Sequence, residues 1–219
     1  MSKLLKPQSS FRRIWRRRRL IAGFILAIAV YLWATGFMLW AGLLGFLTLP
    51  FFKRNKILVA GAKGENAVSK LLLKELDNSW YLINDCIVNK AQIDHILIGP
   101  KGIFVIETKN YKGIVYGNRE DKKWTKTRNS RFKTFYNPIK QSKTHSFKVA
   151  DLLREGHYDY FAFALVVFAG QPLELNITVG DFPVLRIDQL KDYILSQPDK
   201  MLKVRAKEVA GYLIKRIRS

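Results

Sequence analysis

The chain has 219 residues, which is enough for one domain with a short additional segment. Its 38 Lys and Arg residues against 17 Asp and Glu residues give a net charge of +21, which predicts an anionic partner, either nucleic acid or a membrane surface. Cys86 is the single cysteine, which excludes an internal disulfide and a cysteine-based zinc site. It lies in an apolar run, so we expect a buried structural thiol.

The first 52 residues predict a membrane anchor. Residues 1–19 hold eight basic residues and no acid, and residues 20–52 contain no charged residue. This uncharged run of 33 residues is longer than the roughly 20 apolar residues that a membrane-spanning helix needs. We therefore predict a basic N-terminal tail over residues 1–19 and a transmembrane segment over residues 20–52, which anchors the chain in the lipid bilayer of the cytoplasmic membrane.

The sequence leaves two arrangements of this segment open. A single tilted span would place the following domain outside the cell, whereas two short helices broken near Gly36 would form a hairpin with both ends inside. Lys53, Arg54 and Lys56 follow the run, and basic residues on both flanks favour the hairpin. Length favours the single span, because each half of a hairpin would be shorter than the roughly 20 residues of a full span. We expect the C-terminal domain to lie in the cytoplasm.

A helix and a strand are predicted next. The apolar residues of the range 64–76 recur at helical spacing: Ala67, Val68, Leu71, Leu72 and Leu76. Glu65 lies at the start of this predicted helix, where a carboxylate interacts favourably with the helix dipole. The range 81–88 predicts a strand.

The stretch over residues 92–109 predicts a β-hairpin. Gly99-Pro100-Lys101-Gly102 is a strong turn signal between two runs of β-branched residues. If these four residues form the loop, Ile98 pairs with Ile103. Both predicted strands are apolar on both faces, which is typical of strands in the middle of a sheet covered on both sides.

The same register predicts a charged cluster at the open end of the hairpin. Asp94 falls opposite Glu107 and Gln92 opposite Lys109, and the period of two places all four side chains on one face. Two opposed carboxylates repel unless a positive charge lies between them, and a divalent cation and the Lys109 ammonium would both serve. The alternative is the solvated end of an ordinary hairpin. His95 points away from Asp94 by alternation, so we expect a structural role for it.

These residues carry a resemblance to a known family. Asp94 followed by Glu107-Thr108-Lys109 resembles the D…(D/E)xK core of the restriction-endonuclease-like nucleases. Further motifs match in the same order along the chain: residues 61–65, Gln92-Ile93-Asp94-His95, Asn137-Pro138-Ile139, Gln141 and His145. Together, over residues 58–170, they resemble the nuclease-related domain (NERD) family.

The resemblance implies a fold and a chemistry. The fold is an α/β domain in which a restriction-endonuclease-like mixed sheet is flanked by helices. Asp94, Glu107 and the Thr108 carbonyl would hold Mg²⁺ or Mn²⁺, with Glu65 as an accessory ligand. Lys109 would orient the attacking water, Gln141 would orient the water or a phosphate, and His145 would contact the scissile region. The implied substrate is DNA, with RNA as an alternative.

The stretch after the predicted site is strongly basic. Residues 109–148 hold twelve Lys and Arg residues but only two acids, Glu120 and Asp121, a net charge of +10. Aromatic residues are interleaved, and basic and aromatic side chains contact phosphates and unpaired bases respectively. The candidate nucleic-acid contacts are Lys112, Lys122, Lys123, Lys126, Arg128, Arg131 and Lys133. The alternative is a solvated loop whose aromatics, Trp124 among them, belong to the core.

The remaining elements follow from shorter signals. Pro138 predicts a helix start and a helix to about Glu155, on which Gln141 and His145 share a face. Residues 161–168 and 182–187 predict strands. Asp188 is a candidate cap for a short helix. Residues 201–217 predict a basic amphipathic helix, whose expected inward-facing residues are Leu202, Val209, Leu213 and Ile217. We expect residues 171–219 to complete or flank the domain.

The sequence thus predicts a membrane-anchored, metal-dependent nuclease that hydrolyses DNA. The alternative is a catalytically silent, membrane-tethered module that binds nucleic acid. Loss of Asp94, Glu107 or Lys109 would have favoured the silent module, and all three are present.

Overall fold

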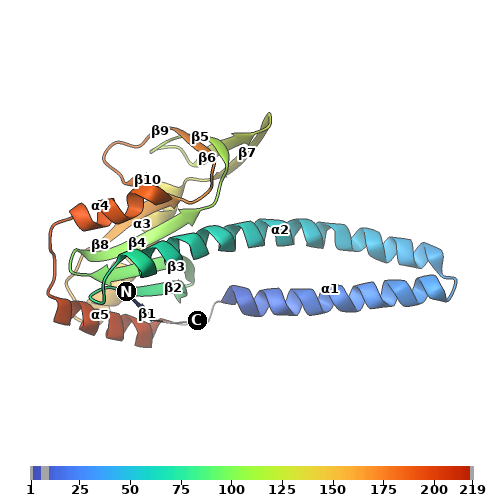
Figure 1. The fold of residues 1–219 in the computed structure, drawn as a ribbon, viewed down its shortest axis with the longest axis horizontal. Coiled ribbons are helices and arrows are strands. Elements are labelled where there is room, and N and C mark those ends of the chain that lie inside the picture. Colours follow the sequence, from blue (N-terminus) through green and yellow to red (C-terminus); the bar gives the residue numbers. More distant parts are fainter. Residues whose placement is uncertain (1, 6–9, 218–219) are drawn as a thin grey trace. The chain divides into compact units, whose positions relative to one another are not determined.

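The computed structural model describes residues 2–5 and 10–217 (Figure 1). The chain divides into two compact units. One unit comprises Ser9–Ala62, and the other comprises Met1–Gln8 together with Lys63–Ser219.

The smaller unit contains helix α1 (Ser10–Ala34) and the first part of helix α2 (Met38–Glu75). A turn at Gly36, which has a φ of 85°, separates the two helices and divides the uncharged run of residues 20–52. Each half of the run is shorter than the roughly 20 residues of a span, and both helices continue into charged sequence. Within the described ranges, no helix is both long and apolar enough to cross a membrane.

The predicted transmembrane segment is therefore not supported, and neither is the lipid bilayer as a partner. The break near Gly36 is where the hairpin alternative placed it. The cytoplasmic location of the C-terminal domain stays a prediction.

The larger unit is built around a six-stranded mixed sheet with the strand order β1-β2-β3-β4-β8-β10. The strands are β1 (Lys3–Leu5), β2 (Tyr81–Val88), β3 (Ala91–Gly99), β4 (Gly102–Lys109), β8 (Ala162–Phe168) and β10 (Val184–Arg186). Strands β2, β3 and β4 are antiparallel to their neighbours in this series, whereas β8 runs parallel to β4 and β1 parallel to β2. This confirms the predicted mixed α/β core. The strand at Lys3–Leu5 was missed, because these residues were assigned to the basic tail.

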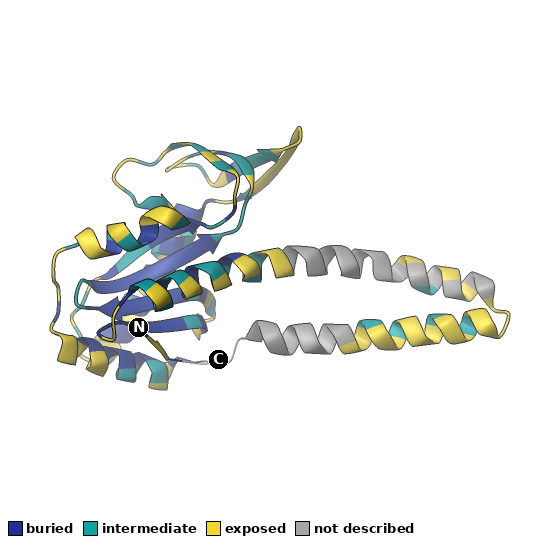
Figure 2. Cartoon of the chain, viewed as in Figure 1, coloured by how far each residue is buried: buried dark blue, intermediate teal, exposed yellow. Residues whose placement is uncertain are grey.

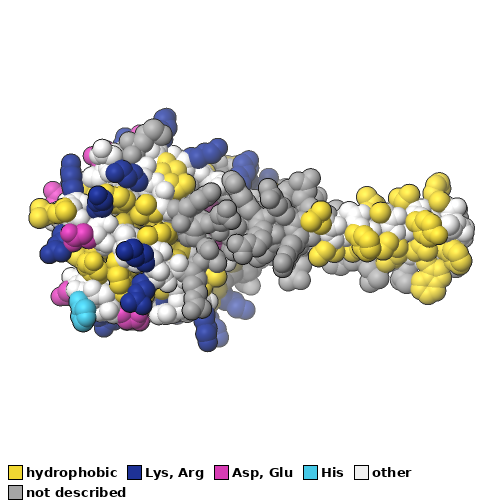
Figure 3. Space-filling model, turned by 90° about the horizontal axis from the view of Figure 1, so that it is seen from below, with side chains coloured by type: hydrophobic (Ala, Val, Ile, Leu, Met, Phe, Trp, Pro, Cys, Tyr) yellow, Lys and Arg dark blue, Asp and Glu magenta, His cyan; other side chains and the backbone are white. Residues whose placement is uncertain are grey.

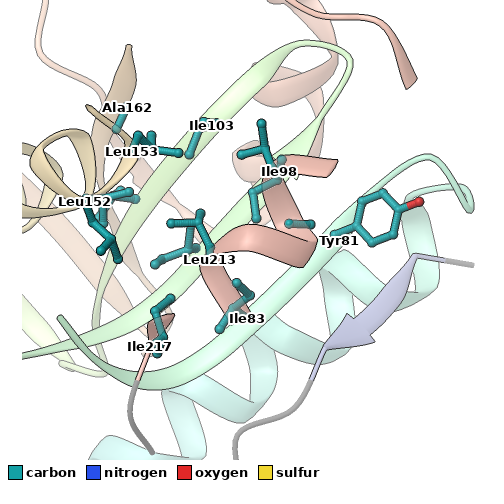
Figure 4. Packing of buried hydrophobic residues seen from close by; sticks show 14 of the residues in the cluster. Tyr81, Ile83, Ile98, Ile103, Leu152, Leu153, Ala162, Leu213 and Ile217 are labelled. Atoms are coloured by element: carbon teal, nitrogen blue, oxygen red, sulfur yellow. The ribbon is translucent and has the colours of Figure 1, made fainter. Parts of the chain in front are cut away.

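Helices cover both faces of this sheet (Figure 2). The end of α2 and helix α4 (Leu190–Ser196) pack through Leu72 and Ile194 on one face. On the other face, α3 (Pro138–Glu155) and α5 (Lys203–Arg216) contribute Leu153 and Leu213 to a cluster with Ile98 (Figure 4). This two-sided burial is why β3 and β4 are apolar on both faces.

A second sheet, with the order β7-β6-β5-β9, occupies much of the basic stretch. Its strands are β5 (Gly113–Asn118), β6 (Lys123–Arg128), β7 (Arg131–Tyr136) and β9 (Leu173–Thr178). The solvated-loop alternative is therefore wrong for most of this stretch, although its assignment of Trp124 to the core is confirmed. Trp124 is fully buried and packs with Phe168 of the central sheet.

Three predicted details differ in the structure. Helix α2 does not begin at residue 64, so Glu65 lies within a continuous helix and does not cap one. Asp188 lies inside the short 3₁₀ helix η1 (Ile187–Gln189), which precedes α4, and it caps no α-helix. In α5, Val209 and Leu213 are buried as predicted, but Leu202 is exposed because the helix begins one residue after it.

His95 and Cys86 are structural, as predicted. Both are buried, and burial raises the pKa of the Cys86 thiol to about 12. His95 Nδ1 lies 2.7 Å from Asn84 Oδ1, and burial lowers the pKa of its imidazole from 6.5 to about 3.

We expect His95 to make the fold sensitive to acid. Below pH 6.5 the unfolded chain binds a proton at this residue, while the folded chain does not until about pH 3, so acid favours unfolding. Between these values this group lowers the free energy of unfolding by at most about 1.4 kcal/mol per pH unit. Urea unfolding at several pH values should show that the free energy of unfolding depends less steeply on pH in His95→Gln than in the wild type. The control is His157→Gln, at an exposed position, which should keep the pH dependence of the wild type. The same pH dependence of the free energy of unfolding in His95→Gln as in the wild type would contradict the expectation.

Candidate active site

The hairpin register that creates the site agrees with the prediction. Strands β3 and β4 pair Ile98 with Ile103, and the last pair toward the open end of the hairpin is His95 with Ile106. Beyond that point the backbone N–H of Thr108 donates to Asp94 Oδ2 at 2.8 Å, so the carboxylate replaces a strand partner. Asp94 is thereby fixed beside the end of β4.

The predicted pair of Gln92 with Lys109 is not formed, because the last pair between β3 and β4 toward this end is His95 with Ile106. Gln92 Nε2 donates to Asp85 Oδ1 at 2.8 Å, and Gln92 pairs with Ile87 of β2, beyond the last pair between β3 and β4.

Glu107 is the centre of the site and is only 2% exposed. Its Oε1 accepts a hydrogen bond from Lys109 Nζ at 2.6 Å, and its Oε2 lies 3.3 Å from His145 Nδ1. Lys109 Nζ also donates to Gln141 Oε1 at 3.0 Å. The ammonium is held between a carboxylate and an amide oxygen. Burial alone would lower the pKa of Lys109, but attraction to Glu107 outweighs it and raises the pKa.

Helix α3 supplies Gln141 and His145, and its sequence explains its position. Asn137 accepts a hydrogen bond from the backbone N–H of Ile139 and so caps the helix, with Pro138 in the first turn. Two small hydroxyl residues then dock it on β8. Ser142 Oγ donates to the Leu165 carbonyl at 3.0 Å, and Ser146 Oγ donates to the Ala162 carbonyl. Gln141 and His145 are thereby brought to the end of β4.

Glu65 approaches the site from α2. A side chain at Gly64 would place its Cβ 2.6 Å from Asn110 Cβ, so only glycine lets the helix lie this close to the chain after β4. The pKa of Glu65 is raised to about 6 by burial, and further by the nearby carboxylates of Asp85 and Glu107. Glu65 is therefore within electrostatic reach of the central carboxylate.

If the predicted nuclease chemistry takes place at this site, Gly64→Ala should lower turnover by up to about 100-fold, because displacing a catalytic group by about 1 Å can cost that much. The added methyl group has to push α2 and Glu65 away from Asn110. The same change favours the helical backbone, which offsets part of the loss of stability. The melting temperature should therefore stay close to that of the wild type although turnover falls. Gly211→Ala in α5 is the matched control, since a Cβ there meets nothing within 4 Å. Equal turnover in both variants would contradict the expectation.

The donor atoms fit a divalent cation. Burial, Glu107 and then Glu65 raise the pKa of Asp94 well above its usual range, so these carboxylates repel one another. Glu107 Oε2 is buried without a hydrogen bond among the described residues. Carboxylate and carbonyl oxygens are the ligands that Mg²⁺ and Mn²⁺ prefer. In the described part of the chain, no three His, Cys, Asp or Glu side chains form a group arranged to hold a metal. Asp94 and Glu107 are the two carboxylates of the site, and metal ligation by them, by the Thr108 carbonyl and by Glu65 stays a prediction.

The predicted nucleic-acid contacts lie on and beside the β6–β7 hairpin. Most are exposed: Lys112, Lys122, Lys123, Arg128, Arg131 and Lys133. Lys126 is half-buried, with its Nζ 3.3 Å from the centre of the Tyr111 ring. Lys and Arg side chains also project around the outline of the domain in the view of Figure 3.

Sequence reasoning missed Asp85 near the site. It is 7% exposed, has a φ of 47° and acts electrostatically on Glu65. A charged residue inside the otherwise uncharged strand β2 was the available signal.

The mixed sheet, its flanking helices and this carboxylate–lysine cluster fit a nuclease-like fold. The chain belongs to the nuclease-related domain family, whose characteristic sequence matches residues 60–169, about half of the chain. The predicted resemblance is confirmed, and the restriction-endonuclease-like placing is consistent with this membership. The chain is also 37% identical to an uncharacterised protein of Bacillus anthracis over 147 residues, which are 65% of this chain and 69% of that protein. No solved structure matches the chain significantly.

Proposed function

We propose that this protein is a metal-dependent nuclease that hydrolyses phosphodiester bonds of DNA. The observation that carries the proposal is the environment of Glu107. A buried carboxylate contacts an ammonium and lies near a second carboxylate, which a structural role alone does not require. Membership of a nuclease-related family makes a polynucleotide the natural substrate.

Asp94, Glu107 and the Thr108 carbonyl would hold Mg²⁺ or Mn²⁺. When bound, such a cation polarises a phosphate and lowers the pKa of a coordinated water. Lys109 would orient the attacking water and stabilise the negative charge that develops on the phosphate. Gln141 fixes the Lys109 ammonium through its 3.0 Å hydrogen bond, so it would position that lysine. His145, beside Glu107 Oε2, would contact the scissile region.

The test is to incubate the full chain with plasmid, linear duplex and single-stranded DNA, and with RNA, in Mg²⁺, Mn²⁺ or EDTA. We expect cleavage of DNA that depends on the metal. Cleavage of RNA alone would change the substrate, and cleavage in EDTA would exclude the metal mechanism. Tight binding without cleavage under every condition would leave the catalytically silent module as the function.

A further inference from the structure

The β6–β7 hairpin carries a ladder of basic side chains on one face. The register pairs Lys126 with Lys133 and Arg128 with Arg131. Side chains two residues apart along a strand share a face, so both pairs lie on the same side of the hairpin. We call these four residues the basic ladder.

The face that carries the basic ladder is the one turned toward the core. The next pair along the same face is Trp124 with Phe135. Trp124 is fully buried in the cluster that joins the two sheets, and Phe135 packs against that cluster. The ladder therefore extends the core-facing side of the hairpin beyond the point where the core ends.

Like charges directly opposite one another destabilise a strand pair. The basic ladder places two such pairs in succession. In the described residues 10–217, none of its four members makes an ion pair with a carboxylate. A feature that weakens the isolated fold in this way points to an anionic ligand that neutralises it.

The inner end of the ladder lies close to the site. Lys126 Nζ is 3.3 Å from the centre of the Tyr111 ring, and Tyr111 follows Lys109 by two residues. The Tyr111 ring also packs edge-on against Phe135, with 4.7 Å between the ring centres. Burial, then Lys133, then Lys109 lower the pKa of Lys126 to about 8, which places Lys126 within electrostatic reach of both lysines.

The opposite face of the hairpin is different in character. It carries Thr125, Thr127, Phe132 and Thr134, and its single basic residue is Lys123, paired with Tyr136. Four of the five basic residues of the two strands therefore lie on one face of the hairpin, which composition alone did not indicate.

We propose that the basic ladder is a track for the phosphodiester backbone of a polynucleotide and leads the strand to the Glu107–Lys109 site. The inference rests on the proposed function, because the track is assigned to the substrate of that site. Rungs two residues apart are about 6.6–6.8 Å apart, comparable with one nucleotide of an extended backbone, so successive rungs take successive phosphates. The ligand class is therefore a strand of several nucleotides, and not a mononucleotide.

The test measures binding of a labelled single-stranded oligonucleotide to the full chain in EDTA, over a range of salt concentrations. Two double variants remove the same charge: Lys126→Gln with Lys133→Gln in the ladder, and Lys203→Gln with Lys207→Gln at exposed positions of α5. Each phosphate contact contributes about 0.7 to the slope of log K against log salt on a single strand. We expect the ladder variant to flatten the slope by about 1.4 and to weaken binding about 25-fold at 0.1 M salt. The control should match the wild type.

A second variant guards against misfolding. Arg128→Gln with Arg131→Gln lies at the exposed end of the hairpin and should flatten the slope similarly. Without DNA, Arg128→Gln with Arg131→Gln should not lower the melting temperature, because it relieves repulsion between the two side chains. Equal effects of the ladder and control variants would overturn the proposal, as would full competition by a mononucleotide.

Because binding is measured without metal, it is independent of cleavage. A chain that cleaves DNA but is indifferent to the ladder variants would refute the track and keep the nuclease. Binding that depends on the ladder without any cleavage would keep the track and refute the nuclease.

Discussion

Asp94→Asn and Glu107→Gln are each expected to abolish DNA cleavage while DNA affinity stays equal or rises. Both changes remove a carboxylate that would hold the metal, and loss of one preorganised electrostatic group commonly costs about 100-fold or more in rate. Both also remove negative charge from the place where a phosphate binds, which favours binding of a polyanion. Turnover in Mg²⁺ and affinity in EDTA should be measured on the same preparations.

The matched control is Glu155→Gln, which makes the same chemical change at an exposed position near the end of α3. It should cleave like the wild type. If both site variants cleave as fast as the wild type in metal-replete buffer, the nuclease assignment is wrong. Loss of cleavage together with affinity would instead indicate that these residues maintain the fold.

The central sheet was predictable because its signals are local and strong. The Gly-Pro-Lys-Gly turn set the register of β3 and β4, and two apolar faces indicated a covered sheet. The start of α3 followed from Pro138, and its predicted end near Glu155 is confirmed. The site followed in turn, because a hairpin register fixes which side chains share a face.

The second sheet was not predictable in the same way. Strand β6 reads Lys-Trp-Thr-Lys-Thr-Arg and buries only Trp124 fully, so its alternation is masked by charge. Strand β9 pairs in parallel with β5, and the paired residues Gly113 and Leu173 are 60 residues apart, so no short-range pattern reveals this pairing. The sorting of basic residues by face, on which the basic ladder depends, exists only once this sheet is known.

The N-terminal region shows a different limit. The uncharged run is longer than the roughly 20 apolar residues that a membrane-spanning helix needs, but this criterion applies to one continuous helix. In the structure the turn at Gly36 divides the run between two helices. Helix α2 then continues through Gly64, whose small size is required by Asn110 and does not mark a helix start. The hairpin alternative already placed a break near Gly36, whereas the close approach of Gly64 to Asn110 could be seen only in the tertiary structure.

Lys109→Met is expected to lower the free energy of unfolding by about 3–5 kcal/mol, because it leaves a buried carboxylate without its cation. The Lys109 and Glu107 side chains are 15% and 3% exposed, so water screens the pair weakly. Adding Glu107→Gln to this variant removes the unpaired charge. The double variant should therefore recover most of the lost stability, as measured by urea unfolding in EDTA.

Turnover should not recover with stability. If Lys109 orients water and stabilises charge on the phosphate, restoring the fold does not restore the chemistry, so the double variant should be stable and inactive. Mg²⁺ supplies a separate readout. It should stabilise Lys109→Met more than the wild type, because Glu107 then has no competing ammonium, whereas the double variant has lost a ligand and should gain little. A double variant as unstable as Lys109→Met in EDTA would show that the 2.6 Å contact is not what stabilises Glu107 in the core.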